Sequence, residues 1–304
     1  MRKPVLIPLF ALAPLLAALS GCDQLMPPSG NDTSSVAAPV SEASSETASE
    51  SVSDSASASA ETSSSAESSS SVAAIDFPHD PATQLVSGSG QGYTDTSNWA
   101  PGICFPIAAT AAYANSQVYS PGGDHYPSYG HASGSQCDSK NYSYPWHDNF
   151  CEARSWSNVM CKSGQGHQGQ DIRPQTCKAK TYWAIAVEDG TITQVGSYTV
   201  ALTGTDTPHR IFRYLHLDAG TLKVKVGDHV VRGQKIGLVS DNFGTSNGVP
   251  QHTTIHLHFE IRVAQSETLS DGTVLAASSF VPPYTALVDA YSRHLNGEDC
   301  KVVE

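Results

Sequence analysis

The sequence predicts a mainly β protein with a small antiparallel sheet core, arranged as a sandwich or partly open barrel, and an irregular, disulfide-pinned layer on its N-terminal side. Two observations predict the core. From about residue 161 the chain runs through short stretches rich in Val, Ile and Thr, and glycine turns separate these stretches. A third observation predicts the layer, because residues 76–160 are rich in Tyr, Gly, Ser, Asn and Pro and hold three cysteines.

The start of the chain predicts export. Two basic residues precede an apolar run over residues 5–19, which is short for a membrane span and is interrupted by prolines. The tetrapeptide LSGC, which ends at Cys22, resembles a bacterial lipobox. The resemblance implies that residues 1–21 are a lipoprotein signal peptide and that Cys22 is lipidated; an ordinary signal peptide with an incidental cysteine is the alternative. We expect the chain to be lipid-anchored in the cell envelope and to face the periplasm. The sequence does not decide between the inner and the outer membrane.

The next segment predicts a tether. Residues 22–75 are dominated by Ser, Ala, Glu and Thr and contain no aromatic residue, so they cannot bury enough apolar surface to fold. The negative charge is concentrated on this side of the chain, because residues 1–139 hold 13 acidic and 2 basic residues whereas residues 140–304 hold 16 and 15. Neither half shows a basic patch, and we expect no nucleic-acid partner.

The cysteines predict disulfides. Besides Cys22 there are six: Cys104, Cys137, Cys151, Cys161, Cys177 and Cys300. An even number in an exported chain favours disulfide pairing, and zinc bound by cysteine is less favoured because no Cys-x-x-Cys occurs. We expect Cys161 to pair with Cys151 or Cys177.

The order of elements follows from local patterns. Residues 106–118 favour one short helix, and residues 182–197 predict two strands joined by a turn at Asp189 and Gly190. Alternating or valine-rich strands are expected over 200–204, 209–217, 222–240 and 255–263, and a last helix over 284–295.

The stretch IHLHFE, residues 255–260, combines two histidines with an apolar strand pattern. Because a strand alternates its faces, Leu257 and Phe259 are expected to face the core. His256, His258 and Glu260 are expected to share the opposite face. An exposed polar face is the simpler interpretation of this pattern, and half of a metal site is the more specific one.

Two further stretches present metal-ligating side chains. GHQGQDIRP carries His167 and Asp171, and YLHLD places Tyr214, His216 and Asp218 on one predicted strand face. Imidazole and carboxylate suit Zn²⁺, and three protein ligands leave a fourth position for water, as in catalytic sites.

Together these motifs resemble the lysostaphin-type (LytM-like) zinc endopeptidases. The resemblance rests on HQGQD (167–171), YLHL (214–217), VG through GQKIG (226–237) and HLHFE (256–260), and covers about residues 160–264. It implies a small antiparallel β core over residues 161–304 that cuts peptide bonds in peptidoglycan cross-links. One departure is that residues 251–255 separate a Gly-Val-Pro turn from the His-x-His strand, which leaves the role of these extra residues and the substrate preference open.

Carried over residue by residue, the resemblance implies that His167, Asp171 and His258 bind one Zn²⁺ with a bound water. It implies that His216 and His256 act on the substrate carbonyl and on proton transfer. Tyr214 is a candidate for a hydrogen bond to the substrate, or else a packing aromatic.

Three functions are compatible with these motifs. The complete motif set favours a membrane-anchored zinc endopeptidase that acts on peptidoglycan stem peptides. The alternative is a non-catalytic LytM-like module that binds and activates a cell-wall amidase, which relatives do after losing ligands. A structural zinc domain leaves two histidines unexplained. The cleaved bond and the oligomeric state are not predicted.

Overall fold

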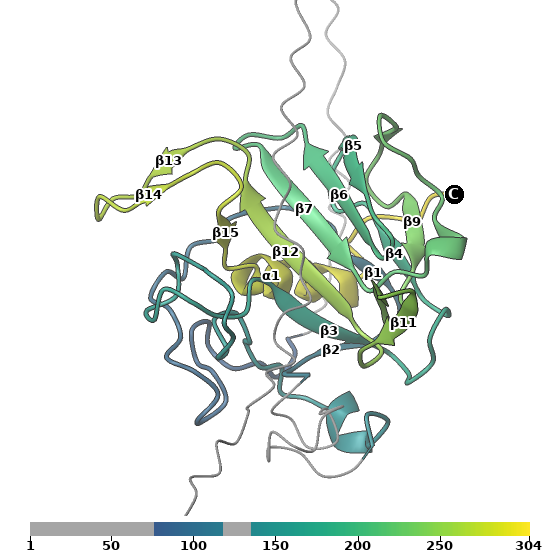
Figure 1. The fold of residues 1–304 in the computed structure, drawn as a ribbon, viewed down its shortest axis with the longest axis horizontal. Helices are drawn as coiled ribbons and strands as arrows, with labels where there is room; N and C mark the ends of the chain where they lie inside the picture. The colour runs from purple at the N-terminus through teal and green to yellow at the C-terminus, as the bar shows by residue number, and fades with distance from the viewer. Residues whose placement is uncertain (1–75, 118–134) are drawn as a thin grey trace, which may run out of the picture. The chain divides into compact units, whose positions relative to one another are not determined.

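An open eight-stranded antiparallel sheet forms the centre of the fold (Figure 1). The computed structural model describes residues 76–117 and 135–304, which lie in one unit, Val72–Glu304. The strand order is β2-β3-β12-β7-β6-β5-β8, with β15 paired to β12. The strands span Ala112–Ala114 (β2), Gln170–Pro174 (β3), Gly190–Val195 (β5), Thr199–Gly204 (β6), Arg210–Leu215 (β7), His229–Val230 (β8), Leu257–Val263 (β12) and Phe280–Val281 (β15).

Smaller elements surround this sheet. A three-stranded sheet has the order β1-β4-β9, and there are two hairpins, β10–β11 and β13–β14. Their bounds are Ile107–Ala108 (β1), Trp183–Ile185 (β4), Lys235–Leu238 (β9), Asn242–Ser246 (β10), Val249–His252 (β11), Glu267–Thr268 (β13) and Val274–Leu275 (β14). Within the described residues, the helical elements are α1, Tyr284–Leu295, and the 3-10 turns Ser139–Tyr142 and Ala219–Thr221. The predicted mainly β, antiparallel fold without a closed barrel is confirmed, as is the final helix.

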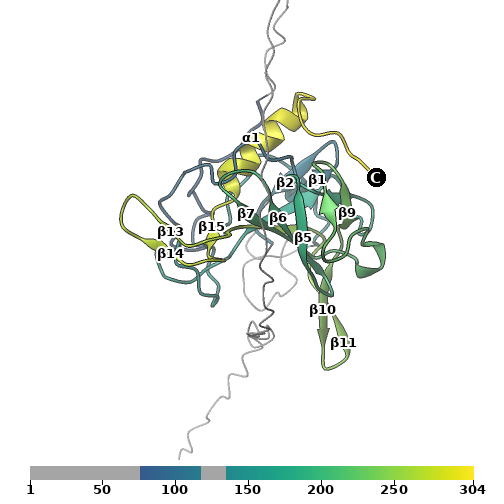
Figure 2. The same ribbon diagram turned by 90° about the horizontal axis from the view of Figure 1, so that it is seen from above.

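The core lies between the large sheet and α1. Figure 2 shows α1 on one side of the sheet, while hairpin β10–β11 projects from the other. Trp146 stacks on Tyr291 of α1 with ring centroids 4.4 Å apart, and the edge of Phe77 meets the same tyrosine at 4.8 Å. The described part of residues 76–160 is irregular, as predicted, and it shares this core with the strands that follow it.

Three disulfides hold the irregular segments. Cys104 pairs with Cys300, Cys137 with Cys177 and Cys151 with Cys161. The prediction that Cys161 pairs with Cys151 or Cys177 is therefore confirmed for Cys151. The bond between Cys104 and Cys300 joins positions 196 residues apart, so it ties the layer to the C-terminal segment.

Two local predictions were wrong. In place of the helix predicted over 106–118, residues 107–108 and 112–114 form β1 and β2, because Ala112 and Ala114 pair with β3 and are fully buried against it. Residues 182–197 form two strands, but β4 pairs with β1 and β9 whereas β5 pairs with β6 and β8. Glycine at position 190 lets β5 approach β6, since a Cβ there would lie 2.2 Å from the Thr203 carbonyl oxygen.

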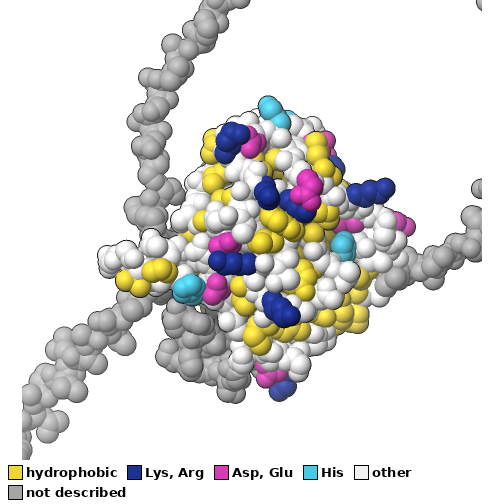
Figure 3. Space-filling model, turned by 90° about the vertical axis from the view of Figure 1, so that its right-hand side faces the viewer, with side chains coloured by type: hydrophobic (Ala, Val, Ile, Leu, Met, Phe, Trp, Pro, Cys, Tyr) yellow, Lys and Arg dark blue, Asp and Glu magenta, His cyan; other side chains and the backbone are white. Residues whose placement is uncertain are grey.

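Charges of both signs are interspersed on the side of the molecule that carries β9 and the C-terminus (Figure 3). One ion pair joins β9 to the C-terminus, Lys235 with Glu304. Within the described residues, no helix is both long and apolar enough to span a bilayer. The predicted signal peptide (1–21), the lipidated Cys22 and the tether (22–75) lie outside the described residues.

Candidate metal centre

Three side chains from distant parts of the sequence converge on one point. The Nε2 atom of His167 lies 2.9 Å from Nδ1 of His258 and 3.4 Å from Oδ1 of Asp171. The third side of this triangle, from His258 Nδ1 to Asp171 Oδ1, is 3.0 Å. All three residues are at most 5% exposed. The register of β12 against β3 pairs His258 directly with Asp171, and this pairing brings the two ligand atoms together.

The triangle fits a zinc ion. Ligand atoms about 2.0–2.1 Å from a tetrahedral Zn²⁺ are separated by roughly 3.3 Å. The observed separations of 2.9, 3.4 and 3.0 Å bracket that value. Two imidazole nitrogens and a carboxylate oxygen are also donors that zinc prefers. His167, Asp171 and His258 would hold the ion.

Asn149 fixes the orientation of two of these residues. Its carbonyl oxygen accepts a hydrogen bond from His167 Nδ1 at 2.9 Å, which leaves Nε2 of His167 free of a proton toward the cluster. Its side-chain Nδ2 donates to Asp171 Oδ2 at 3.0 Å. Asn149 stands in the irregular layer, and the sequence analysis missed it because an isolated asparagine carries no pattern.

Glu260 has a corresponding role for the third ligand. The side chain of Glu260 is buried, and its Oε1 lies 3.3 Å from Nε2 of His258. A carboxylate on the outer nitrogen of a metal-binding histidine fixes the ring and its tautomer. The burial of Glu260 and this contact with His258 indicate such a role and exclude a solvent-facing position.

Gly169 permits the close approach of β3 to β12. A Cβ at this position would lie 2.5 Å from the Phe259 carbonyl oxygen and 2.7 Å from Nε2 of His258. Real Cβ atoms do not approach backbone oxygens this closely. The glycine between His167 and Asp171 therefore lets the chain pass over β12 with both side chains directed at the cluster.

The alternation predicted for β12 is confirmed. Leu257 and Phe259 are fully buried in the core, while His256 and His258 lie on the other face. Nδ1 of His256 donates to the Thr254 carbonyl oxygen at 2.8 Å. Its Nε2 faces the cluster, 3.4 Å from Asp171 Oδ1.

His216 joins the site through an unusual backbone conformation. β7 ends at Leu215, and His216 has a φ of +66°, in the left-handed region. Its ring centroid lies 4.5 Å from that of His256. Nδ1 of His216 donates to the Asn242 carbonyl oxygen at 3.0 Å, so the two histidines carry their ring proton on Nδ1 and present Nε2 as an acceptor.

The expectation that Tyr214, His216 and Asp218 share one face was wrong. Tyr214 pairs with Phe259 and packs in the core, where its hydroxyl accepts a hydrogen bond from the Val187 amide at 3.0 Å. Asp218 pairs with Lys180 at 3.0 Å. The left-handed residue His216 breaks the alternation of the strand, so Tyr214 lies on the opposite face and not at the candidate site.

Burial and the neighbouring charges set the protonation of the site. Burial would raise the pKa of Asp171, but His167 and His256 outweigh this effect and hold it well below its usual value. Burial, followed by the nearby His256, lowers the pKa of His216 well below its usual value. Burial also opposes a charge on His258, yet hydrogen bonds to Asp171 and Glu260 raise its pKa to about 9 before any metal is bound.

The first two of the extra residues before His256, residues 251–252, end hairpin β10–β11, which projects from the sheet (Figure 2). Phe243 of β10 lies 5.5 Å from the His216 ring, and Tyr198 stacks on that ring at 5.9 Å. His252 pairs with Asp241 at 3.2 Å and is exposed. The hairpin therefore forms a side wall next to His216, and His252 does not reach the cluster.

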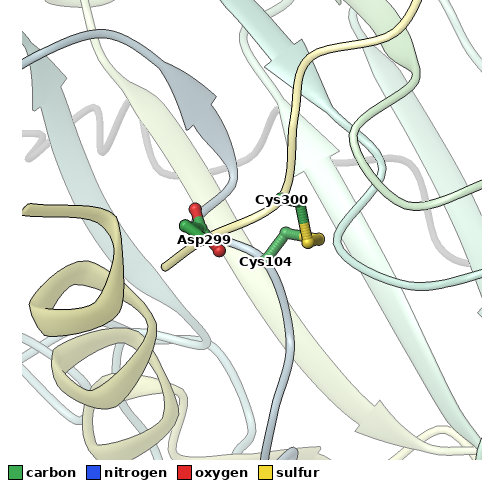
Figure 4. Close-up of side chains that lie close together, drawn as sticks. All are labelled: Cys104, Asp299 and Cys300. Atoms are coloured by element: carbon green, nitrogen blue, oxygen red, sulfur yellow. A yellow bond between two sulfur atoms is a disulfide. The ribbon is translucent and has the colours of Figure 1, made fainter. Parts of the chain in front are cut away.

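A second cluster of metal-ligating residue types is not a metal site. Cys104, Asp299 and Cys300 lie together in Figure 4, but the two sulfurs are joined in a disulfide and have no thiolate to offer. Oδ2 of Asp299 accepts a hydrogen bond from the Phe105 amide at 3.1 Å. This cluster fixes the C-terminal segment to the core.

The site combines one candidate metal position with two adjacent histidines. Residues 165–275 match the model of Peptidase family M23, and this part of the chain is a domain of that family. The lysostaphin-type resemblance is thus confirmed for the domain. No match is found among curated protein sequences.

Several solved structures are similar to the chain. The LytM protein of Ruminococcus gnavus, assigned as a glycyl-glycine endopeptidase, is 22% identical with a TM-score of 0.34 over 45% of this chain and 50% of its own. The catalytic domain of lysostaphin from Staphylococcus simulans is 24% identical with a TM-score of 0.27, over 42% of this chain and 89% of its own. A zinc-containing peptidase from Vibrio cholerae is 29% identical with a TM-score of 0.24, over 33% and 29%. The chain thus spans half of the R. gnavus protein.

Proposed function

We propose that the protein is a zinc-dependent endopeptidase that hydrolyses peptide bonds in peptidoglycan stem-peptide cross-links. The observation that carries this proposal is the meeting of five buried side chains at one point. Three of them present atoms at zinc-ligand separations, and two present unprotonated imidazole nitrogens beside them. Membership of residues 165–275 in a peptidase family supports the same reaction class.

Zinc held by His167, Asp171 and His258 would supply a Lewis acid for the scissile carbonyl and lower the pKa of water. The two other histidines then act on proton transfer. Nε2 of His256, close to Asp171, accepts a proton from the attacking water and passes it to the leaving amine. Burial keeps His216 neutral with its ring proton on Nδ1, so its Nε2 is a second acceptor that can share the transferred proton with His256.

The envelope location completes the proposal. A signal peptide over residues 1–21, a lipid on Cys22 and a tether over 22–75 would hold the domain (161–304) and its layer (76–160) on a membrane that faces the periplasm. Peptidoglycan is the nearest polymer there. The tether would reach roughly 40 Å by its r.m.s. length.

An amidase-activating module is the less favoured function, because all five side chains of the site are present and brought together. The test is digestion of purified murein sacculi with the zinc-loaded protein, followed by analysis of the released muropeptides. We expect new amine termini with the wild type and none with His258→Ala. Wild-type protein that binds zinc yet releases nothing would refute the endopeptidase and favour the module.

A further inference from the structure

Two arginines lie on the same sheet face as the candidate metal ligand His258. We propose that Arg213 and Arg262 form a subsite for a carboxylate of the bound peptide. This inference rests on the proposed function and names the class of its substrate, an acidic peptide with a carboxylate a few residues from the bond that is cut.

The strand register places both arginines on this face. Along β12, His258, Glu260 and Arg262 alternate with core residues and therefore point the same way. Arg213 of β7 pairs directly with Glu260, so its side chain joins them. The arginine side chains are each 19% exposed whereas Glu260 is 3% exposed, so a ligand reaches the guanidinium groups and not the buried carboxylate.

Glu260 holds the two arginines rigidly and leaves them with donors to spare. It accepts from Nη1 of Arg213 at 2.9 Å and from Nε and Nη2 of Arg262 at 2.9 and 2.8 Å. Arg262 also lies over the ring of Phe280, 4.2 Å from its centroid. A guanidinium has five N–H donors, so both groups retain N–H donors that Glu260 does not engage.

The charge balance favours an anion. Two arginines against one glutamate leave this trio with one net positive charge. A guanidinium binds a carboxylate through two parallel hydrogen bonds, which adds geometric selectivity to the charge attraction. Because Glu260 already fixes both side chains, a ligand need not pay the entropy of ordering them.

The spacing sets where the carboxylate must sit. Arg213 is level with Glu260, two residues from His258 along β12, and Arg262 is four residues away. At about 3.3 Å per residue these positions lie roughly 7 and 13 Å from the metal ligand. An extended peptide over this face would place a carboxylate about two to four residues from the scissile bond. Neutral glycine-rich peptides lack that group.

The test uses pairs of short N-acetylated alanine peptides in which one alanine, at each position in turn, is replaced by Glu or by Gln. Their dissociation constants are measured by calorimetry with the zinc-loaded His256→Ala protein, which avoids turnover. We expect one or two positions where the Glu peptide binds roughly tenfold more tightly than its Gln partner. Arg262→Gln and Arg213→Gln should each remove most of that preference, and Arg262→Lys should keep part of it.

The matched control is Arg232→Gln, which changes an arginine that pairs with Asp206 away from this face. It should leave the preference intact. Equal binding of Glu and Gln peptides at every position would overturn the subsite, and so would a preference that survives both substitutions. Failure of the wild-type protein to cleave sacculi would count against the endopeptidase and not against this binding preference, so the two failures are distinguishable.

Discussion

Asp171 and His258 face each other across adjacent antiparallel strands, with Oδ1 of the first 3.0 Å from Nδ1 of the second. They are 87 residues apart in the sequence. Sheet pairing, rather than a local motif, therefore creates the centre, and side chains behind it hold the ligands in place.

Glu260→Gln is expected to weaken zinc binding by roughly 10- to 100-fold, because an amide accepts a weaker hydrogen bond from His258 than the carboxylate does. It also leaves Arg213 and Arg262 without their shared counter-ion. Competition with a chromophoric chelator measures the zinc dissociation constant. The matched control is Glu267→Gln, which changes the partner of Arg210 on another part of the sheet. Equal zinc affinity in both variants would contradict the assigned role of Glu260.

Tyr214→Phe is expected to lower the free energy of unfolding by about 1–3 kcal/mol, because the buried amide of Val187 loses its hydrogen-bond acceptor. The rate of peptide cleavage per folded molecule should stay at the wild-type value, since the side chain lies in the core. Urea unfolding and a cleavage assay on the same samples test both parts. A selective loss of cleavage with unchanged stability would contradict this assignment and indicate that Tyr214 contacts the substrate.

Stability should depend on pH through Glu152, since burial raises its pKa from the usual 4.5 to about 7. The folded protein therefore keeps a proton on Glu152 between pH 4.5 and 7 that the unfolded chain releases, so this residue costs stability as pH rises through that window. The full effect is about 3 kcal/mol.

Glu152→Gln removes this titration. The unfolding free energy of the variant minus that of the wild type should increase from pH 4.5 to 7 and stay constant above pH 7. Denaturant unfolding across this range measures it, with the exposed Glu298→Gln as the control. A gap that does not change with pH would show that Glu152 is ionised in the folded state throughout.

Much of the fold followed from local pattern. The strand 257–263 and the helix 284–295 were predictable because alternation and helical periodicity are local properties. The error at 106–118 arose because alanine favours helices in isolation, while here sheet pairing with β3 selects an extended chain. The partners of β4 and β5 were not predictable, because pairing between distant strands depends on the whole sheet.

The residues of the site also divide into those that local motifs predict and those whose position depends on the whole fold. His167, Asp171, His216, His256 and His258 stand in recognisable motifs, and the structure brings all five together. The position of Tyr214 was mispredicted because one left-handed residue, His216, inverts the face of the strand end. Asn149 was missed because its function depends on where an irregular segment folds back.

The zinc content of His256→Ala, measured beside that of His258→Ala in protein also assayed for cleavage, tests the central claim most directly. His258 is assigned to the metal and His256 to the reacting groups. We predict that His256→Ala retains one zinc per chain but cleaves sacculi at least about 100-fold more slowly, whereas His258→Ala loses zinc and cleavage together. Loss of zinc from His256→Ala, or full cleavage by it, would contradict this division of roles.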